Sequence, residues 1–132
     1  MEKLHPEGLK KLPPDSRDFS FGAIYSLPKL TELPAEFMVA GPLAIKDQKG
    51  TDYCTSYAGT SVSEDQEGVV LSPFYQFYKT KQGDTSWGAD LRQACKSLTK
   101  FGSLELNQDP YNVDSPRGEL LEGKKYTPLH DL

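Results

Sequence analysis

The sequence predicts a mainly α-helical fold flanked by irregular arms. Three segments between residues 54 and 102 combine helical spacing of apolar residues with a start or stop signal. Residues 1–35, in contrast, hold five of the chain's 10 prolines, and the 11 glycines add further breaks in regular structure. We therefore expect one helical part, an extended arm before it and an irregular tail after it.

Composition narrows the class of protein. A length of 132 residues with 36% apolar residues fits a single domain with a modest core. The 15 basic and 19 acidic residues give a net charge of −4, and the basic residues are scattered, which argues against nucleic acid as a partner. The chain also lacks the apolar run of a membrane span and the apolar core of a secretory signal. These features predict a soluble, unexported protein with no membrane contact, and nothing in the sequence implies a metal or cofactor.

The first 35 residues are expected to form an extended, proline-rich arm that lies on another surface. Their one sustained apolar run is the segment at residues 21–27, which could add a short strand. The irregular character continues to Gly50. The first helix is then predicted from Cys54 to Gly68, with Gly68 as the residue after its last turn. Its small residues would let the helix pack close to its neighbours. Its spacing of three and four is carried by Tyr57, Ala58, Ser61, Val62 and Asp65.

A second helix is predicted to begin after Ser72, a natural N-cap, with Pro73 in its first turn and Gly83 at its end. Its apolar face would be Phe74, Phe77 and Tyr78. The third helix, within residues 88–102, carries the clearest apolar stripe and stops at Gly102. That stripe consists of Leu91, Ala94, Cys95, Leu98 and Phe101. The tail at 112–132 shows no period and is expected to be loop, or a connection to further structure.

The position of Cys54 suggests thiol chemistry. A helix N-terminus lowers the pKa of a thiol, and the thiolate is the nucleophile. Gln48 lies six residues upstream, where its amide could join the Cys54 backbone N–H in stabilising an oxyanion. The competing interpretation is a small buried residue at a helix start. Cys95, inside the apolar stripe, is expected to be a packing residue, and no Cys54–Cys95 disulfide is expected because two cysteines make no disulfide framework.

The segment "DQKGTDYCTSYAGTSVSE" resembles the active-site segment of papain-like cysteine peptidases, in which a glutamine precedes the nucleophilic cysteine by six residues. Tyr57 falls where the family has an aromatic residue and Glu64 where its central helix carries a glutamate. Downstream, "LSPFYQFY", "WGADLRQACKSLTKFG" and "DPY" are similar to family segments in the same order. The resemblance covers residues 36–111, is closest in style to bacterial or viral members, and implies the helical half of an α+β fold without its β-rich half. The cysteines that lock this region by a disulfide in the family are absent here, which implies a cytoplasmic or virion-associated protein in a reducing environment.

The resemblance implies a role for each matching position. Cys54 would attack a peptide carbonyl as a thiolate, and Gln48 would donate to the oxyanion. Gly88 would pair through its backbone with an extended peptide substrate. Trp87 and Tyr53 would line the cleft, although Trp87 is equally open to interpretation as a packing aromatic.

Two departures bear on activity. Asp52 places a carboxylate two residues before the thiol, which opposes thiolate formation by like-charge repulsion. The family's histidine and asparagine lie roughly 130–150 residues after the cysteine, and here only His5 and His130 exist. Neither matches the family's histidine position. The isolated chain is therefore expected to be inactive.

Three functional hypotheses remain. The first is a cysteine peptidase homologue acting on peptide or protein substrates, with its remaining half supplied elsewhere. The second is a non-catalytic structural or interaction protein, for example of a virion, whose terminal arms dock on partner chains. The third is an unrelated small α-helical binding module.

Overall fold

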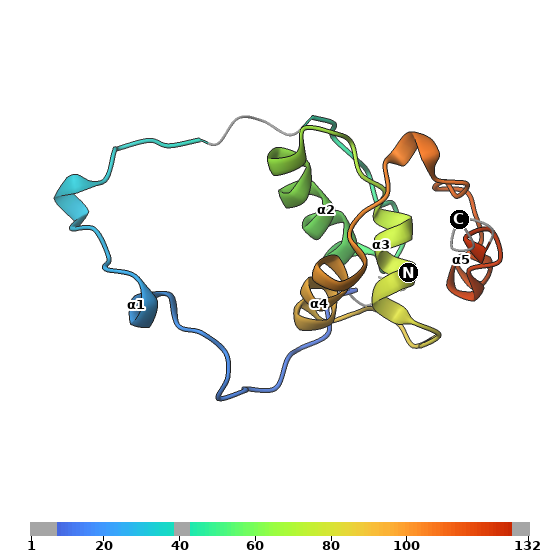
Figure 1. The fold of residues 1–132 in the computed structure, drawn as a ribbon, viewed down its shortest axis with the longest axis horizontal. Coiled ribbons are helices and arrows are strands. Elements are labelled where there is room, and N and C mark those ends of the chain that lie inside the picture. Colours follow the sequence, from blue (N-terminus) through green and yellow to red (C-terminus); the bar gives the residue numbers. More distant parts are fainter. Residues whose placement is uncertain (1–7, 39–42, 128–132) are drawn as a thin grey trace, which may run out of the picture.

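The computed structural model describes residues 8–38 and 43–127. Within these residues the protein is mainly helical and contains no β-strand beyond two isolated bridges, which confirms the expected helical class. A bundle of helices forms one part, and a long loop extends away from it (Figure 1). The elements in chain order are α1 (Phe21–Ile24), η1 (Leu30–Glu32), α2 (Cys54–Glu67), α3 (Pro73–Lys81), α4 (Leu91–Phe101), η2 (Leu106–Gln108) and α5 (Arg117–Glu122).

Helix α2 begins at Cys54 and ends before Gly68, which adopts the left-handed conformation with φ of 73°. Both limits confirm the prediction. The buried face is polar, however, and consists of Thr55, Ser56, Thr60 and Glu64, whereas Val62 and Asp65 of the expected face are exposed. Two of these residues are satisfied by hydrogen bonds: the Thr60 Oγ1 donates to the Ser56 carbonyl of its own helix at 2.8 Å, and the Glu64 carboxylate accepts from the Leu71 N–H at 2.7 Å.

Helix α3 starts as predicted. The Ser72 hydroxyl accepts from the backbone N–H groups of Phe74 and Tyr75, which caps the helix. Phe74 and Phe77 are buried, as the apolar pattern predicts. The helix ends one residue earlier than expected because Gln82, with φ of 43°, already leaves the right-handed conformation.

Helix α4 confirms its predicted limits but not its predicted face. Asp90 caps it through a bond from the Gln93 N–H at 2.7 Å, and Gly102 ends it. The buried residues are Ala94 and Ser97, and Cys95 is exposed. Cys95 is therefore not a core residue, because the buried face of α4 contains its neighbour Ala94 and not Cys95 itself.

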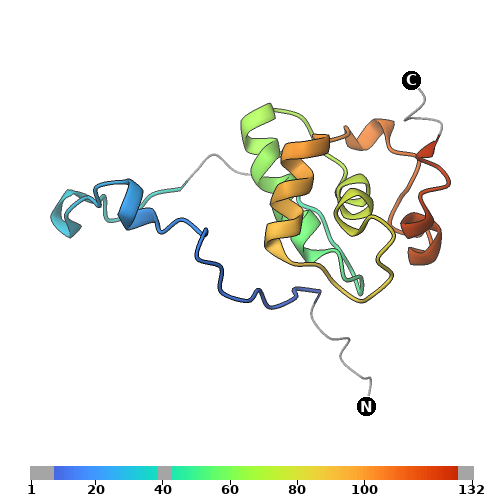
Figure 2. The same cartoon turned by 60° about the horizontal axis from the view of Figure 1, so that its bottom comes forward.

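The three long helices pack against one another. Helices α2 and α4 lie side by side, and both contact α3 (Figure 2). The approach of α2 to α4 is close: a Cβ added to Gly59 would meet the Leu98 side chain at 3.2 Å. The main core lies on the other side of α3. It contains Tyr53, Phe74, Phe77, Ala89, Tyr111, Leu120, Leu121 and Tyr126.

The C-terminal segment belongs to this core, although its sequence predicts a loop. Helix α5 buries Leu120 and Leu121, and the Tyr126 ring stacks on the Tyr78 ring with centroids 5.1 Å apart. The Tyr126 hydroxyl donates to the Asp109 carboxylate. The helix has only six residues, so its sequence shows too little of the helical period to be recognised.

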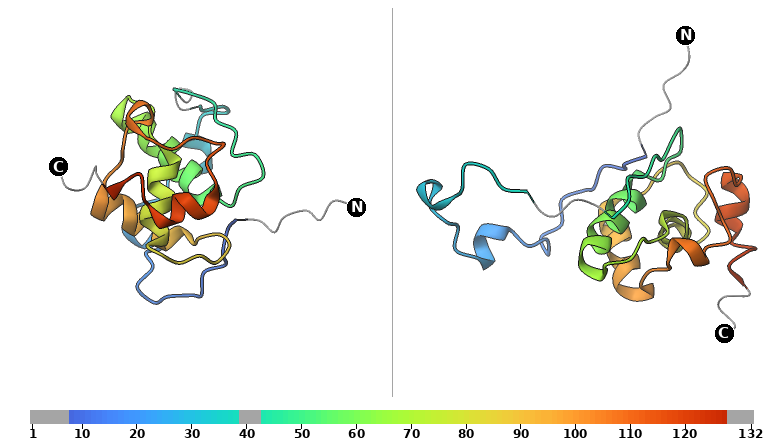
Figure 3. Two further views of the ribbon diagram at one scale, coloured as in Figure 1. Left: turned by 90° about the vertical axis from the view of Figure 1, so that its right-hand side faces the viewer. Right: turned by 90° about the horizontal axis from the view of Figure 1, so that it is seen from above.

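The arm forms a loop that leaves the helices near residue 11 and returns near residue 45 (Figures 1 and 3). Much of it lacks regular structure, with only α1 and η1 in between. Many of its large apolar side chains are exposed: Phe19 and Leu30 each by 87% and Met38 by 89%. No helix among the described residues has the length and apolar character needed to cross a membrane.

Candidate active site at the start of the central helix

Cys54 is the first residue of α2, as predicted, and is half-buried. The 14-residue helix directs the positive end of its dipole toward this residue, and its first turn contains no acidic side chain. Both features favour a negative charge on the sulfur. Cys54 and Cys95 form no disulfide with each other.

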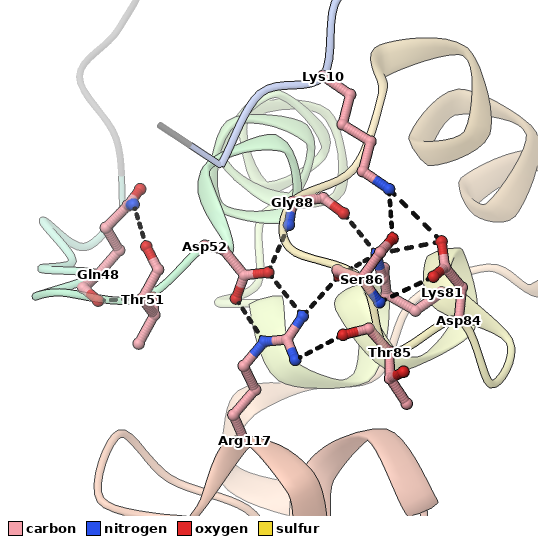
Figure 4. A network of polar contacts seen from close by, with 10 residues as sticks. All are labelled: Lys10, Gln48, Thr51, Asp52, Lys81, Asp84, Thr85, Ser86, Gly88 and Arg117. Carbon is pink, nitrogen blue, oxygen red and sulfur yellow. Dashed lines mark hydrogen bonds and ion pairs between the residues drawn. The ribbon is translucent and has the colours of Figure 1, made fainter. Parts of the chain in front are cut away.

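Gln48 lies in a tight turn that immediately precedes the helix. The turn is closed by the Thr51 hydroxyl, which donates to the Gln48 carbonyl at 2.7 Å, and by Lys49 with φ of 51°. The Gln48 side-chain amide donates to the Thr51 carbonyl at 3.0 Å (Figure 4). The amide is thus engaged within its own turn and would have to exchange this bond to donate to an oxyanion.

Asp52 is completely buried and is clamped by Arg117. The Nε and Nη2 atoms of Arg117 each donate to one carboxylate oxygen at 2.9 Å, and the Gly88 N–H donates at 2.6 Å (Figure 4). Burial raises the pKa of Asp52, but the bonds from Arg117 and Gly88 outweigh it, so the pKa lies below its ordinary value. The negative charge beside Cys54 is therefore matched by a cation.

Arg117 joins three separated segments. Besides Asp52, it donates to the carbonyl oxygens of Thr85 and Ser86, and its guanidinium lies 5.5 Å from the centre of the Trp87 ring. Arg117 is not among the residues that the sequence predicts for the site, because it lies in a segment without a recognisable pattern, 65 positions after Asp52. The sequence does contain one sign of such a partner: Asp52 stands just before a predicted helix, and a carboxylate buried there would need a basic residue to pair with it.

The loop before α4 is held in place by a buried lysine, Lys81. The Lys81 ammonium donates to the carbonyl oxygens of Ser86 and Gly88 and pairs with Asp84 at 3.3 Å. Burial lowers the pKa of Lys81, and Asp84 opposes that shift. Gly88 itself has φ of 75°, a conformation that favours glycine. Its backbone N–H and carbonyl are thus both engaged inside the protein.

The backbone beside Gly88 is paired with the arm. The Ala89 N–H donates to the Gly8 carbonyl at 2.8 Å, and the Lys10 N–H donates to the Ala89 carbonyl at 2.9 Å, as in a parallel bridge. The fit is tight at Gly8, where an added Cβ would lie 2.4 Å from the Asp52 carbonyl oxygen. An extended chain therefore already runs beside the position predicted to receive substrate.

The two aromatic residues predicted to line a cleft lie in different environments. Tyr53 is 3% exposed, and its ring packs in the core at 4.3 Å from the Phe77 ring, so it does not line an open cleft. Burial, followed by the Asp52 charge, raises the pKa of Tyr53 to about 12. Trp87 is half-buried and stacks with Arg117 near the arm.

A cavity of about 480 Å³ opens one helical turn beyond Cys54. It is lined by Tyr57 from α2, by Phe74 from α3, and by Tyr111 and Val113 from the segment after η2. Burial, followed by the Asp47 charge, raises the pKa of Tyr57. The cavity is mainly apolar and lies on the same side as the Gln48 turn, since Lys46 and Asp47 also line it.

His5 and His130 lie outside the described residues. Within the described residues, no group of three or more His, Cys, Asp or Glu side chains is placed to hold a metal ion. No protein-family model, curated protein or solved structure matches this chain. The function of the site therefore rests on its own geometry and on the pattern of residues around Cys54.

Proposed function

We propose that this chain is the helical half of a papain-like cysteine peptidase homologue. The observation that carries the proposal is the position of Cys54 as the first residue of α2, directly after the turn that holds Gln48. In this proposal Cys54 attacks a peptide carbonyl as a thiolate, and its backbone N–H and the Gln48 amide stabilise the oxyanion.

Two further observations support the proposal. The Asp52 charge, one of the two departures that bear on activity, is paired with Arg117 at 2.9 Å, so it does not stand alone beside the thiol. The arm segment that pairs with the Ala89 backbone supports the proposal as well, because a substrate could bind in the same extended form. Substrate pairing at Ala89 would require the arm segment to move away, and pairing at Gly88 would also require its bonds with Asp52 and Lys81 to open.

The proposal requires a general base for Cys54 that the described residues do not supply. The described residues contain no histidine, and neither His5 nor His130 matches the family's histidine position, so in this proposal a β-rich half supplies the group that deprotonates Cys54 and protonates the leaving amine. The apolar cavity lined by Tyr57, Phe74 and Tyr111 is the surface against which that half would pack. Without it, the isolated chain is expected to have negligible peptidase activity.

Differential labelling of the two cysteines tests the proposal. Cys95 is exposed and Cys54 is half-buried, so accessibility alone makes Cys95 react faster. If the start of α2 activates the thiol, a peptide epoxide should modify Cys54 at least ten times faster than Cys95 at pH 7. Mass spectrometry of the two tryptic peptides over time gives both rates in one sample. Equal rates, or faster labelling of Cys95, would contradict the proposal.

The exposed apolar arm favours a second candidate function, a non-catalytic component of an assembly. Large side chains such as Phe19, Leu30 and Met38 are rarely left in water along so long a segment unless another surface covers them. A triple substitution of these residues by serine should abolish concentration-dependent assembly in sedimentation experiments. Serine substitution of Cys54 should leave that assembly unchanged. A wild-type chain that stays monomeric at all concentrations would count against this role.

A further inference from the structure

A second cavity, of about 350 Å³, lies between the C-terminal parts of α3 and α4, away from Cys54. We call it the lysine pocket, because Lys79, Lys81, Lys96 and Lys100 line it together with Phe101. No carboxylate is among its lining residues. In a chain with net charge −4, this local concentration of positive charge runs against the overall composition.

The charges of two of these lysines, Lys96 and Lys100, are not balanced by an ion pair in the described part of the chain, whereas Lys81 pairs with Asp84. Asp15 of the arm lies within electrostatic reach of Lys96, yet its carboxylate is already held by Arg17 at 2.6 Å. The C-terminal end of α4 offsets only about half a charge, so these two lysines alone leave more than one positive charge in excess.

The lysines are also close to one another. The Nζ atoms of Lys79 and Lys100 lie 4.9 Å and 5.1 Å from the centre of the Phe101 ring, which places them at most about 10 Å apart, within one screening length at 0.1 M salt. Lys96 and Lys100 are four residues apart on the same helix, where like charges destabilise. Burial lowers the pKa of Lys79. An anion in the pocket would relieve all of these costs.

We propose that the lysine pocket binds a phosphate dianion, either as free phosphate or as the phosphoryl group of a larger compound. An ammonium group is a compact charge suited to phosphate oxygens and demands no planar geometry. Lysines from both helices line the pocket, and the Lys81 ammonium, already bonded to the Ser86 and Gly88 carbonyls, is not needed for the ligand. The two buried hydroxyl groups at the pocket wall, Thr80 and Ser97, are small enough to leave it open. This site is independent of the proposed thiol chemistry.

Thermal unfolding with added ligand tests whether the lysine pocket binds phosphate. Inorganic phosphate and phosphoserine are each titrated against sodium chloride at matched ionic strength. At ten times the dissociation constant, phosphate should raise Tm by about 5 °C more than chloride does. A larger response to phosphoserine would assign the site to a phosphorylated compound, and an equal response to free phosphate.

A double substitution, Lys96→Gln with Lys100→Gln, should remove this specific response and raise Tm in the absence of ligand, because like-charge repulsion is relieved. Both residues are exposed, so the variant should fold. Lys29→Gln, on the distant arm, is the matched control and should respond like the wild type. Phosphate also stabilises proteins non-specifically, but that effect would be the same in all three proteins. Equal responses of the double variant and the wild type would therefore overturn the proposal.

Discussion

Arg117 of α5 holds both carboxylate oxygens of Asp52, two residues before Cys54, at distances of 2.9 Å. This clamp links the C-terminal segment to the start of the central helix. It also fixes the loop before α4, because the same guanidinium binds the Thr85 and Ser86 carbonyls. One side chain thus sets the relative positions of three segments that surround the candidate nucleophile.

Arg117→Met should lower the free energy of unfolding by about 3 kcal/mol, because it leaves the buried Asp52 charge with only the Gly88 N–H. Urea denaturation measures the change. Lys124→Met, which removes a surface pair with Glu122, is the control and should cost well under 1 kcal/mol. Similar losses in the two variants would mean that the clamp does not stabilise the fold.

Stability should fall in acid partly through Asp52. Its pKa is lower in the folded protein than in the unfolded chain, so its contribution is complete above about pH 4 and is lost as the pH falls further. Asp52→Asn should flatten the dependence of unfolding free energy on pH in that range, by up to about 1.4 kcal/mol per pH unit.

The exposed residue Asp114 provides the control for this measurement. Its side chain is 86% exposed, so Asp114→Asn should leave the acid slope unchanged. Urea denaturation at several pH values between 2 and 6 gives the slopes. An Asp52→Asn slope that equals the wild-type slope would contradict the assigned role of Asp52.

Gly8→Val should detach the arm from the candidate active site. The added side chain would collide with the Asp52 backbone, which cannot move without disturbing the start of α2. Hydrogen exchange of the Ala89 N–H should become at least tenfold faster, and that of α3 should remain unchanged. Gly50→Ala, at a position with open space around its Cβ, should have no such effect.

The buried pair of Lys46 and Glu64 should show strong coupling. Lys46 bonds to the Glu64 carboxylate and to the Leu71 carbonyl, and thereby ties the returning end of the arm to α2. Lys46→Met alone should cost about 3–5 kcal/mol, because it leaves the Glu64 charge buried. Adding Glu64→Gln should recover part of this loss. A double variant less stable than Lys46→Met would show that the unpaired Glu64 charge is not what destabilises the single variant.

The long helices could be predicted because their signals are local. Ser72, Gly68 and Gly102 act on the residues next to them, and the structure places them at helix ends. The buried face of α2 could not be predicted, since Thr60 and Glu64 are buried through hydrogen bonds that apolar periodicity does not reveal. The position of Cys54 at the helix start was likewise a local inference, and it is confirmed.

The surroundings of the candidate site depend on distant partners and were largely missed. Asp52 appears in sequence as an unpaired charge, and only the fold brings Arg117 to it. The segment Gly8–Lys10 has no strand-like pattern, yet it pairs with Ala89 because the loop geometry returns it there. Gln48 has the predicted spacing, but its amide direction is set by the Thr51 turn rather than by spacing.

The Leu9–Ala89 bridge also constrains the order of folding. Helices α2, α3 and α4 follow one another closely in sequence and can assemble through short-range contacts, whereas this bridge closes a loop that includes α2 and α3. Contacts of such large sequence separation form late and are the first to break under mild destabilisation. We therefore expect a transient state in which the bundle is assembled and the peptide groups beside Gly88 are open to water.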